Sequence, residues 1–519
     1  MSKSRLISAV ATAGFVIISL LGAPDGPTQA ASWTSQTPMG SYGIDFQDSN
    51  ILSGVSRVQA FSKEQINSMP NMYLCNSSRS GNCDPSKNSL QAEVILPKCE
   101  NAAQTFCIDS LSLSQSNGTF NAASFIRTIG SSKLDGDPKE DLPQGTAPSL
   151  WKSDVLNAGN TATYEVIGIV QLDWRDGKFM PRDLSVEVNP YSEITGSFQA
   201  TKDEEITFAN GRIGVSTSGH NPGCVWTDAG LCGVREDFSR DTQVRLAVRL
   251  SSAIGGWFKG RLSSPAIQVT PTSGTANLVT VSGAAVNVPQ VSIGVPHDSA
   301  PDAIKQYFAK MGGYVDGFVT SRSDYPNSFD ALELFREVAR DKSQGSLTKW
   351  SFGTFGAAGN PCLTNTTKVL GLVTTNATLY TGQAPSFQDG QLTYKVAGYH
   401  YLADDSLNLG TYDLIMRKDT ARCLYNFGSA PISATVSVSS DKGVENVATT
   451  TFTEDENWDH FQAYGFTFSQ PSISIKLTQE KPAVAPGGGA KRTITCVKGK
   501  LTKKVSGTAP KCPAGYKKK

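Results

Sequence analysis

Residues 242–250 read TQVRLAVRL, and apolar side chains occupy every second position of this stretch. The apolar set that shares one side of an extended chain is Val244, Leu246, Val248 and Leu250. Successive side chains of a strand point to opposite faces, so this spacing predicts a strand with one buried face. The two arginines fall on the other side and predict a solvated face, as in an antiparallel sandwich or barrel.

The same period of two recurs on both sides of this stretch. Asp176-Gly177 and Asp389-Gly390 supply hairpin turns between such strands. We therefore expect a mainly β protein with two antiparallel β-sandwich-like domains. The further stretches that alternate are 161–174, 266–271, 276–283, 289–296, 387–396, 410–418, 432–440 and 472–479.

The period changes to that of helices between the two groups of strands. APDAIKQYFAKM and SFDALELFREVARDK place apolar side chains at helical spacing. We expect a short helical pair that covers an open end of a sheet and carries no chemistry. The side chains that would face inward are Ile304, Phe308, Leu332, Phe335 and Val338.

A chain of 519 residues exceeds the size at which single cores stop growing, about 250–300 residues. Residues 346–479 hold seven or eight expected strands, which fits an immunoglobulin-like sandwich. The expected division is a signal peptide (1–30), an N-terminal β-rich domain with disulfide-tied loops (31–298), the helical pair (299–345), the C-terminal β domain (346–479), a flexible linker (480–490) and a cationic tail (491–519).

The first thirty residues have the features of a cleaved secretion signal. Lys3 and Arg5 precede an apolar run from Leu6 to Leu21, and Thr28-Gln29-Ala30 puts small residues at the two positions that a signal peptidase inspects, with cleavage expected near Ala30. We expect export to the cell surface or the medium, and no membrane-spanning segment once the signal is removed.

Ten cysteines, an even number, predict disulfides in an exported chain. Three successive pairs are separated by seven residues each, which favours local pairing and leaves crossed pairing among the first four open. The expected pairs are Cys75/Cys83, Cys99/Cys107, Cys224/Cys232, Cys362/Cys423 and Cys496/Cys512.

No familiar catalytic pattern is present. The sequence has no nucleophile elbow, P-loop, HExxH motif or dinucleotide fingerprint, and no CxxC. We expect no catalytic residue, no metal site and no cofactor. The four histidines, for which we expect structural roles, are His220, His297, His400 and His460.

Two acidic stretches and three tryptophans are the weaker candidates for ligand binding. LDGDPKEDL (134–142) and TEDENWD (453–459) could supply oxygens to Ca²⁺, but neither has EF-hand spacing, and we expect solvated loops. Trp174, Trp257 and Trp458 could form sugar-binding platforms, but we expect core positions for most of them.

The tail concentrates positive charge. Residues 491–519 hold ten of the 47 basic residues of the chain and none of its 46 acidic residues. So few residues cannot build a core, so we expect the Cys496–Cys512 disulfide to organise them and to hold the lysines on one face. The lysines expected to bind polyanions are Lys498, Lys500, Lys503, Lys504, Lys511, Lys517, Lys518 and Lys519.

TITCVKGKLTKKVSGTAPKCPAGYKKK resembles a C-terminal tail of exported, largely uncharacterised actinobacterial proteins. GTYDLIMRKDTARCLYNFGSAPISATVSV and YGFTFSQPSISIKLTQ are similar to the β module that often precedes it. The resemblance covers about the last 160 residues, both cysteines of the tail included. It implies export and a cell-surface setting without implying an activity.

We therefore expect a non-enzymatic, envelope-associated protein that adheres or binds glycans. Its expected partners are anionic envelope polymers or glycans, and not nucleic acid, because Tyr516 is the tail's one aromatic residue. The alternatives are a secreted glycan-active hydrolase and a subunit of a polymeric surface layer. The oligomeric state does not follow from the sequence.

Overall fold

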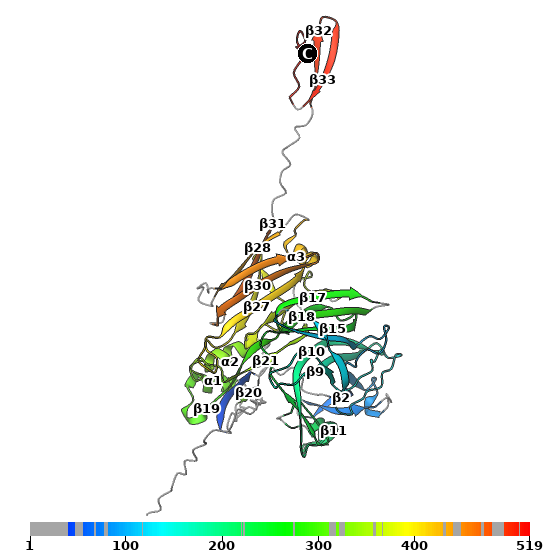
Figure 1. The fold of residues 1–519 in the computed structure, drawn as a ribbon, viewed down its shortest axis with the longest axis vertical. Helices are drawn as coiled ribbons and strands as arrows, with labels where there is room; N and C mark the ends of the chain where they lie inside the picture. Colours follow the sequence, from blue (N-terminus) through cyan, green and yellow to red (C-terminus); the bar gives the residue numbers. More distant parts are fainter. Residues whose placement is uncertain are drawn as a thin grey trace, which may run out of the picture.

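A computed structural model shows a mainly β protein, as the alternating stretches predict (Figure 1). The expected signal peptide and linker lie outside the residues that it describes. The described residues are 40–46, 55–66, 69–76, 81–116, 118–219, 221, 224–272, 276–310, 318–320, 327–355, 360–365, 367–428, 432–439, 448–468, 472–479, 492–507 and 509–519.

One fifteen-stranded sheet runs through both halves of the chain. Its main path, in spatial order, is β29 (Thr449–Glu454), β30 (Trp458–Thr467), β27 (Leu409–Arg417), β23 (Val369–Thr375), β16 (Gly256–Arg261), β22 (Ser351–Phe355), β10 (Lys178–Thr195), β9 (Thr163–Arg175), β4 (Asn88–Ile95), β2 (Arg57–Ile66) and β3 (Met69–Cys75). The strands off this path are β14 (Leu231–Arg235) on β10, β13 (Trp226–Asp228) on β14, β8 (Ser149–Lys152) on β9, and β7 (Ser124–Thr128) on β8.

Two smaller sheets pack against the long one. The first is β17 (Ser263–Pro271), β18 (Ala276–Ala284), β15 (Thr242–Ser251), β5 (Cys107–Gln115) and β6 (Asn121–Ala122). The second is β24 (Leu379–Tyr380), β26 (Gln391–Ala397), β31 (Ser472–Gln479) and β28 (Ile432–Ser439), with β25 (Ser386–Gln388) paired to β26.

A four-stranded sheet carries the helical pair. The sheet is β20 (Phe318–Thr320), β1 (Ser41–Phe46), β19 (Val286–Pro296) and β21 (Gly345–Lys349), and the helices are α1 (Asp302–Lys310) and α2 (Asn327–Phe335). As predicted, Ile304, Phe308, Leu332 and Phe335 are buried, and they pack on Ile44, Phe46 and Val291. The second helix ends before Val338, because residues 336–340 form a turn.

The remaining elements are short. The tail forms its own three-stranded sheet, whose strands pair only with one another. These elements are β11 (Lys202–Thr207) paired with β12 (Ile213–Ser218), the tail strands β32 (Arg492–Lys498), β33 (Leu501–Gly507) and β34 (Lys517–Lys518), the helix α3 (Lys418–Tyr425), and the 3-10 turns η1 (Gly81–Cys83) and η2 (His297–Ser299).

Each smaller sheet encloses a separate hydrophobic core against the long sheet. Val244, Leu246, Val248 and Leu250 of β15 are fully buried in the first core, as their spacing predicts. The second core gathers side chains of β23, β27 and β30 against β26 and β31. Figure 1 shows the two sandwiches one above the other, with β27, β28 and β30 above β9, β10 and β15.

The two cores lie on opposite faces of the same strands. In β16 the fully buried side chain of Trp257 packs in the second core, and that of its neighbour Phe258 packs in the first. β16 pairs in parallel with β23, which is buried along its whole length. The expected division between β domains is therefore not a break in the sheet, because the two sandwiches share strands.

The five disulfides are those that the spacing favours, and the first four cysteines pair locally. The bonded pairs are Cys75–Cys83, Cys99–Cys107, Cys224–Cys232, Cys362–Cys423 and Cys496–Cys512. Cys99–Cys107 closes a loop, as expected, although Cys75, Cys107 and Cys232 themselves belong to strands.

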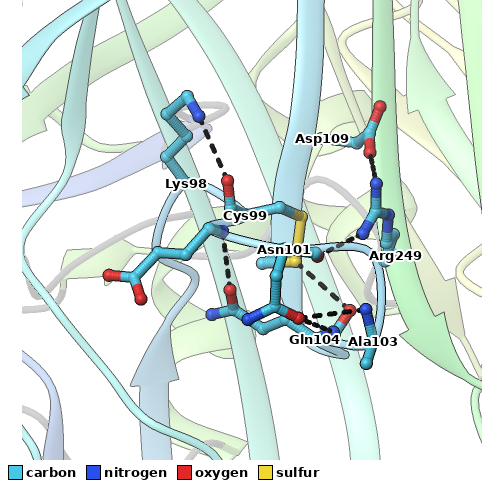
Figure 2. The surroundings of a disulfide bond; sticks show 9 residues. Lys98, Cys99, Asn101, Ala103, Gln104, Asp109 and Arg249 are labelled. Carbon is cyan, nitrogen blue, oxygen red and sulfur yellow. Dashed lines mark hydrogen bonds and ion pairs between the residues drawn. A yellow bond between two sulfur atoms is a disulfide. The ribbon is translucent and has the colours of Figure 1, made fainter.

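Figure 2 shows how the Cys99–Cys107 loop is held: the main-chain N–H groups of Ala103 and Gln104 donate to Asn101 Oδ1 at 3.0 and 3.1 Å. Arg249 of β15 donates to the Asn101 carbonyl at 2.6 Å and pairs with Asp109. Thus Arg249, expected to be solvated, joins the disulfide loop to the sheet.

The Cys224–Cys232 disulfide lies inside the fold and does not tie an exposed loop. Cys232 is the second residue of β14, is 2% exposed, and lies opposite Ile194 of β10 and Thr227 of β13. Its bonded partner Cys224 is 5% exposed, and both pack with Val234 in a small apolar cluster. This bond therefore closes the β13–β14 hairpin from within, because Val234 and Phe198 pack against the two cysteines.

Gly371 of β23 is the position where the shared strands are most sensitive to added volume. A Cβ there would lie 2.3 Å from Trp257 Cζ3 and 2.5 Å from the Ile415 carbonyl oxygen. We expect Gly371→Ala to lower the free energy of unfolding by about 1–3 kcal/mol, the usual cost of overpacking. Thermal unfolding of the oxidised protein measures this. Gly428→Ala, whose Cβ would meet nothing closer than 4.0 Å, is the control; equal midpoints for the two variants would contradict the shared-strand packing.

Candidate polyanion interface

The tail folds into a small antiparallel sheet around Cys496. β32 pairs with β33 through a turn at Gly499, and β34 returns along the other side of β32, opposite Cys496 and Val497. Cys496 bonds to Cys512 and is fully buried, whereas the rest of the tail is exposed or half-buried. The disulfide is therefore the centre of this module.

The register divides the lysines between the two faces of the tail sheet. Lys503 and Lys518 lie opposite Cys496 and share its face, which carries the disulfide. Lys504 lies opposite Thr495, and Lys517 lies opposite Val497, on the reverse face. The expectation that the disulfide holds the lysines on one face is wrong, because adjacent lysines in a strand point to opposite sides.

All eight predicted polyanion-binding lysines are exposed, as is Arg492, and Lys491 lies outside the described residues. Within the described part of the chain, no salt bridge engages any of these side chains. Body lysines differ: Lys178 pairs with Asp141 at 2.7 Å and Lys342 with Asp405 at 2.8 Å. The positive charge of the tail is thus not neutralised by neighbouring carboxylates.

The acidic stretch 134–142 does not gather its carboxylates around one point. Asp135 pairs with Lys133 at 3.1 Å, and Asp141 pairs with Lys178. Among the described residues there is no group of three or more His, Cys, Asp or Glu side chains placed to hold a metal ion.

The carboxylates of the stretch 453–459 also lie in different surroundings. Glu454 pairs with Lys418 at 3.1 Å near the hairpin turn, whereas Asp459 is fully buried. Within the described residues, neither carboxylate oxygen of Asp459 has a hydrogen-bond partner. Burial raises the pKa of the Asp459 carboxyl to about 6, so this residue is a destabilising core position and not a surface ligand.

The tryptophans named as sugar-binding candidates serve the cores. Trp257 and Trp458 are buried, and the half-buried Trp174 packs edge-on against Phe179 at 5.0 Å. Two of the three candidates are therefore core residues, as expected, and Trp174 is partly buried against the first core.

A cavity of about 810 Å³ lies beside the helical pair. Its acidic lining includes Glu333 and Asp341, and Arg336 pairs with both, at 2.8 Å to Glu333. Asp341 also contacts His400 Nδ1 and accepts from the His400 main-chain N–H at 3.0 Å. These contacts join the end of α2 to the segment before β27.

Sequence reasoning missed a group of buried polar side chains on β9, β10 and the end of β21. Glu165, Glu187, Asn189 and Lys349 are each at least 95% buried, although alternation alone would place such side chains in water. A signal was present: Glu165 interrupts the apolar run YEVIGIV, and a strand buried on both faces makes its second face apolar as well.

No protein-family model matches the chain, and a search of curated proteins finds no similar sequence. The resemblance of the last 160 residues to exported actinobacterial proteins therefore stays a prediction.

We expect the double variant Cys496→Ala/Cys512→Ala to unfold the tail and leave the body intact. A crosslink that closes a loop of this length stabilises by about 3 kcal/mol, more than the few other contacts of the tail can replace. Hydrogen exchange of peptides from residues 492–519 would become fast, while the thermal midpoint of the body stays unchanged. Slow exchange in this variant would contradict the central place of the disulfide.

Asp459 predicts a pH-dependent stability. Its pKa is about 6 in the fold against 3.8 as its ordinary value, so ionisation is disfavoured in the native state and stability falls as pH rises through about 6. Asp459→Asn removes this loss: it should be neutral near pH 4 and stabilising by at most about 3 kcal/mol near pH 8. Denaturant unfolding at both pH values tests this. Asp135→Asn, a change in an exposed loop, is the control and should show no such difference between the two pH values. An equal effect of Asp459→Asn at both pH values would contradict the predicted pH dependence.

Proposed function

We propose that the protein is exported and attaches to anionic polymers of the cell envelope through its cationic tail, while the body faces outward. The observation that carries the proposal is the set of exposed tail lysines with no carboxylate partner in the described chain. No acidic residue occurs in residues 491–519, so nothing within the tail competes with an external anion.

The arrangement of the lysines favours attraction by charge over recognition of one ligand shape. Charges on both faces of a small sheet attract a polyanion from several directions, and such contacts weaken as salt screens them. The remainder of the chain carries more acidic than basic residues, which would keep the body from lying on the same polymer.

The extracellular setting rests on two supports. Five disulfides are typical of proteins in oxidising compartments. The predicted signal and the resemblance of the tail to exported actinobacterial proteins point the same way. Among the described residues, no helix is long and apolar enough to cross a membrane.

The cavity beside the helical pair supports the alternative of a glycan-active hydrolase less well than the exposed lysines support attachment through the tail. Such an enzyme needs a carboxylic acid and a carboxylate that face each other across the substrate. Arg336 engages both Glu333 and Asp341, which commits two of the four carboxylates that line the cavity to ion pairs and leaves Asp330 and Glu337.

Binding to immobilised dextran sulfate, with uncharged dextran as the neutral matrix, tests the attachment. We expect the full chain to bind and to elute as salt rises, and a chain that ends at Ala490 to pass through. With isolated cell envelopes, too, we expect the full chain to bind and the truncated chain to remain unbound. Equal retention of the truncated chain would show that the β domains carry the recognition and would refute tail attachment.

Two matched double variants test whether binding to the polyanion depends on the total charge of the tail or on one particular face of its sheet. Lys503→Gln/Lys518→Gln removes two charges from the disulfide face, and Lys504→Gln/Lys517→Gln removes two from the reverse face. We expect both to elute from dextran sulfate at the same lowered salt concentration, because screened attraction depends on total charge. A much larger loss in one variant would indicate a face-specific site.

A further inference from the structure

Three polar side chains lie in one row that crosses β9 and β10 of the long sheet and ends at the last residue of β21. Glu165 of β9 is directly opposite Asn189 of β10. On the other side of β10, Glu187 is opposite Ser351, and the Val188 N–H donates to the Trp350 carbonyl at 3.1 Å. Ser351 is the first residue of β22. If the same register is continued two residues beyond this pair, Lys349 lies opposite Asn189.

The row is closed to water. Lys349 is 1% exposed, Glu165 is 2% exposed and Asn189 is 5% exposed. An ammonium group is rarely buried so completely, because loss of hydration favours its neutral form. A lysine, an asparagine and a glutamate therefore share one water-excluded space.

Both ends of the Asn189 carboxamide are held. Its Nδ2 donates to Glu165 Oε2 at 3.0 Å, and its Oδ1 accepts from Arg235 Nη2. A guanidinium on the carbonyl oxygen polarises the C=O bond and stabilises negative charge that develops there. The carboxamide carbon is thus placed as an electrophile.

A second carboxylate holds the lysine. Lys349 Nζ lies 3.3 Å from Glu187 Oε1, and Glu187 Oε2 accepts from Arg235 Nη2 at 2.9 Å. In a water-excluded site this carboxylate is within reach to accept the ammonium proton. Glu187 therefore faces the amine, whereas Glu165 faces the amide nitrogen.

The two carboxyl groups lie in different surroundings. Burial raises the pKa of Glu165, and the nearby negative charge of Glu187 acts in the same direction, which favours the neutral acid. Arg235 and Lys349 both pair with Glu187, so the Glu187 carboxylate lies on the amine side of the site. One acid and one base on either side of a reacting bond is the arrangement that proton transfer needs.

We propose that Lys349 and Asn189 form an intramolecular isopeptide bond with loss of ammonia. Lys349 Nζ gives a proton to Glu187 and attacks Asn189 Cγ, and the C=O electron pair moves to Oδ1 beside Arg235. Glu165 gives its proton to Nδ2, the C–N bond breaks, and ammonia leaves as the C=O bond re-forms. The Glu165 carboxylate takes the remaining extra proton from Nζ, and the departing ammonia takes the proton from Glu187.

The product is a neutral amide in place of a buried ammonium, which removes the cost of keeping that charge out of water. It would tie β21 to β10 and enclose the chain between residues 189 and 349. No oxidant or cofactor is required, so the bond would form once the strands have paired.

Peptide mapping by mass spectrometry of the full chain, reduced and alkylated, tests the proposal. The expected result is a branched peptide that joins Lys349 to Asn189 and is lighter than the two separate peptides by one ammonia. Recovery of both peptides unlinked from protein with a cooperative thermal transition would overturn it. A branch from Lys349 to Glu187, lighter by one water, would overturn the assignment to Asn189.

Variants separate the chemistry from folding. Glu165→Gln keeps an oxygen that can accept from Asn189 but removes the acid, and we expect the branched peptide to disappear while the cooperative transition persists. Glu236→Gln, a change at another buried glutamate that accepts from Ser192, should leave the branch intact. An undiminished branch in Glu165→Gln would refute the role of Glu165. Should Glu165→Gln fail to fold, Lys349→Arg, which keeps the charge but not the reactive amine, provides the unlinked reference.

Discussion

The parallel pairing of β16 with β23 is the contact on which the rest of the body depends. Each strand has its two faces in two different cores, so Trp257 and Phe258, adjacent in sequence, stabilise different sandwiches. Parallel strands are normally covered on both faces, and here the covers are two antiparallel sheets. A substitution in either strand is therefore expected to affect both sandwiches. The two cores meet at these shared strands, so no break in the sheet separates them.

The features that could be predicted from sequence are those with a clear period. The alternation in β15, the Asp176-Gly177 turn between β9 and β10, and the apolar face of α1 all lie where the residues indicate. The shared sheet could not be predicted, because β23 is apolar on both faces and a strand without alternation does not reveal its partners. Its pairing with β16 joins segments more than a hundred residues apart.

The candidate site, too, has some features that could be predicted from the sequence and others that could not. The charge of the tail and its disulfide follow from composition and spacing, whereas the distribution of lysines over two faces depends on the register of three strands. The buried row at Asn189 depends on more: β9, β10 and β21 must meet before Glu165, Asn189 and Lys349 become neighbours. Glu165 alone reads as one more outward polar residue of a half-buried strand.

The disulfides leave one part of the fold without a covalent tie. Three of them close loops with a sequence separation of 8, Cys362–Cys423 lies within the second sandwich, and Cys496–Cys512 lies in the tail. None of them joins the strands where the helical pair returns to the long sheet. A bond between Lys349 and Asn189 would lie at that return, where the ion pair between Lys349 and Glu187 already links the end of β21 to β10 without a covalent tie. If the tail fixes the chain to the envelope, force on the body would pass through this sheet, and a covalent tie there would resist separation of the strands after hydrogen bonds had broken.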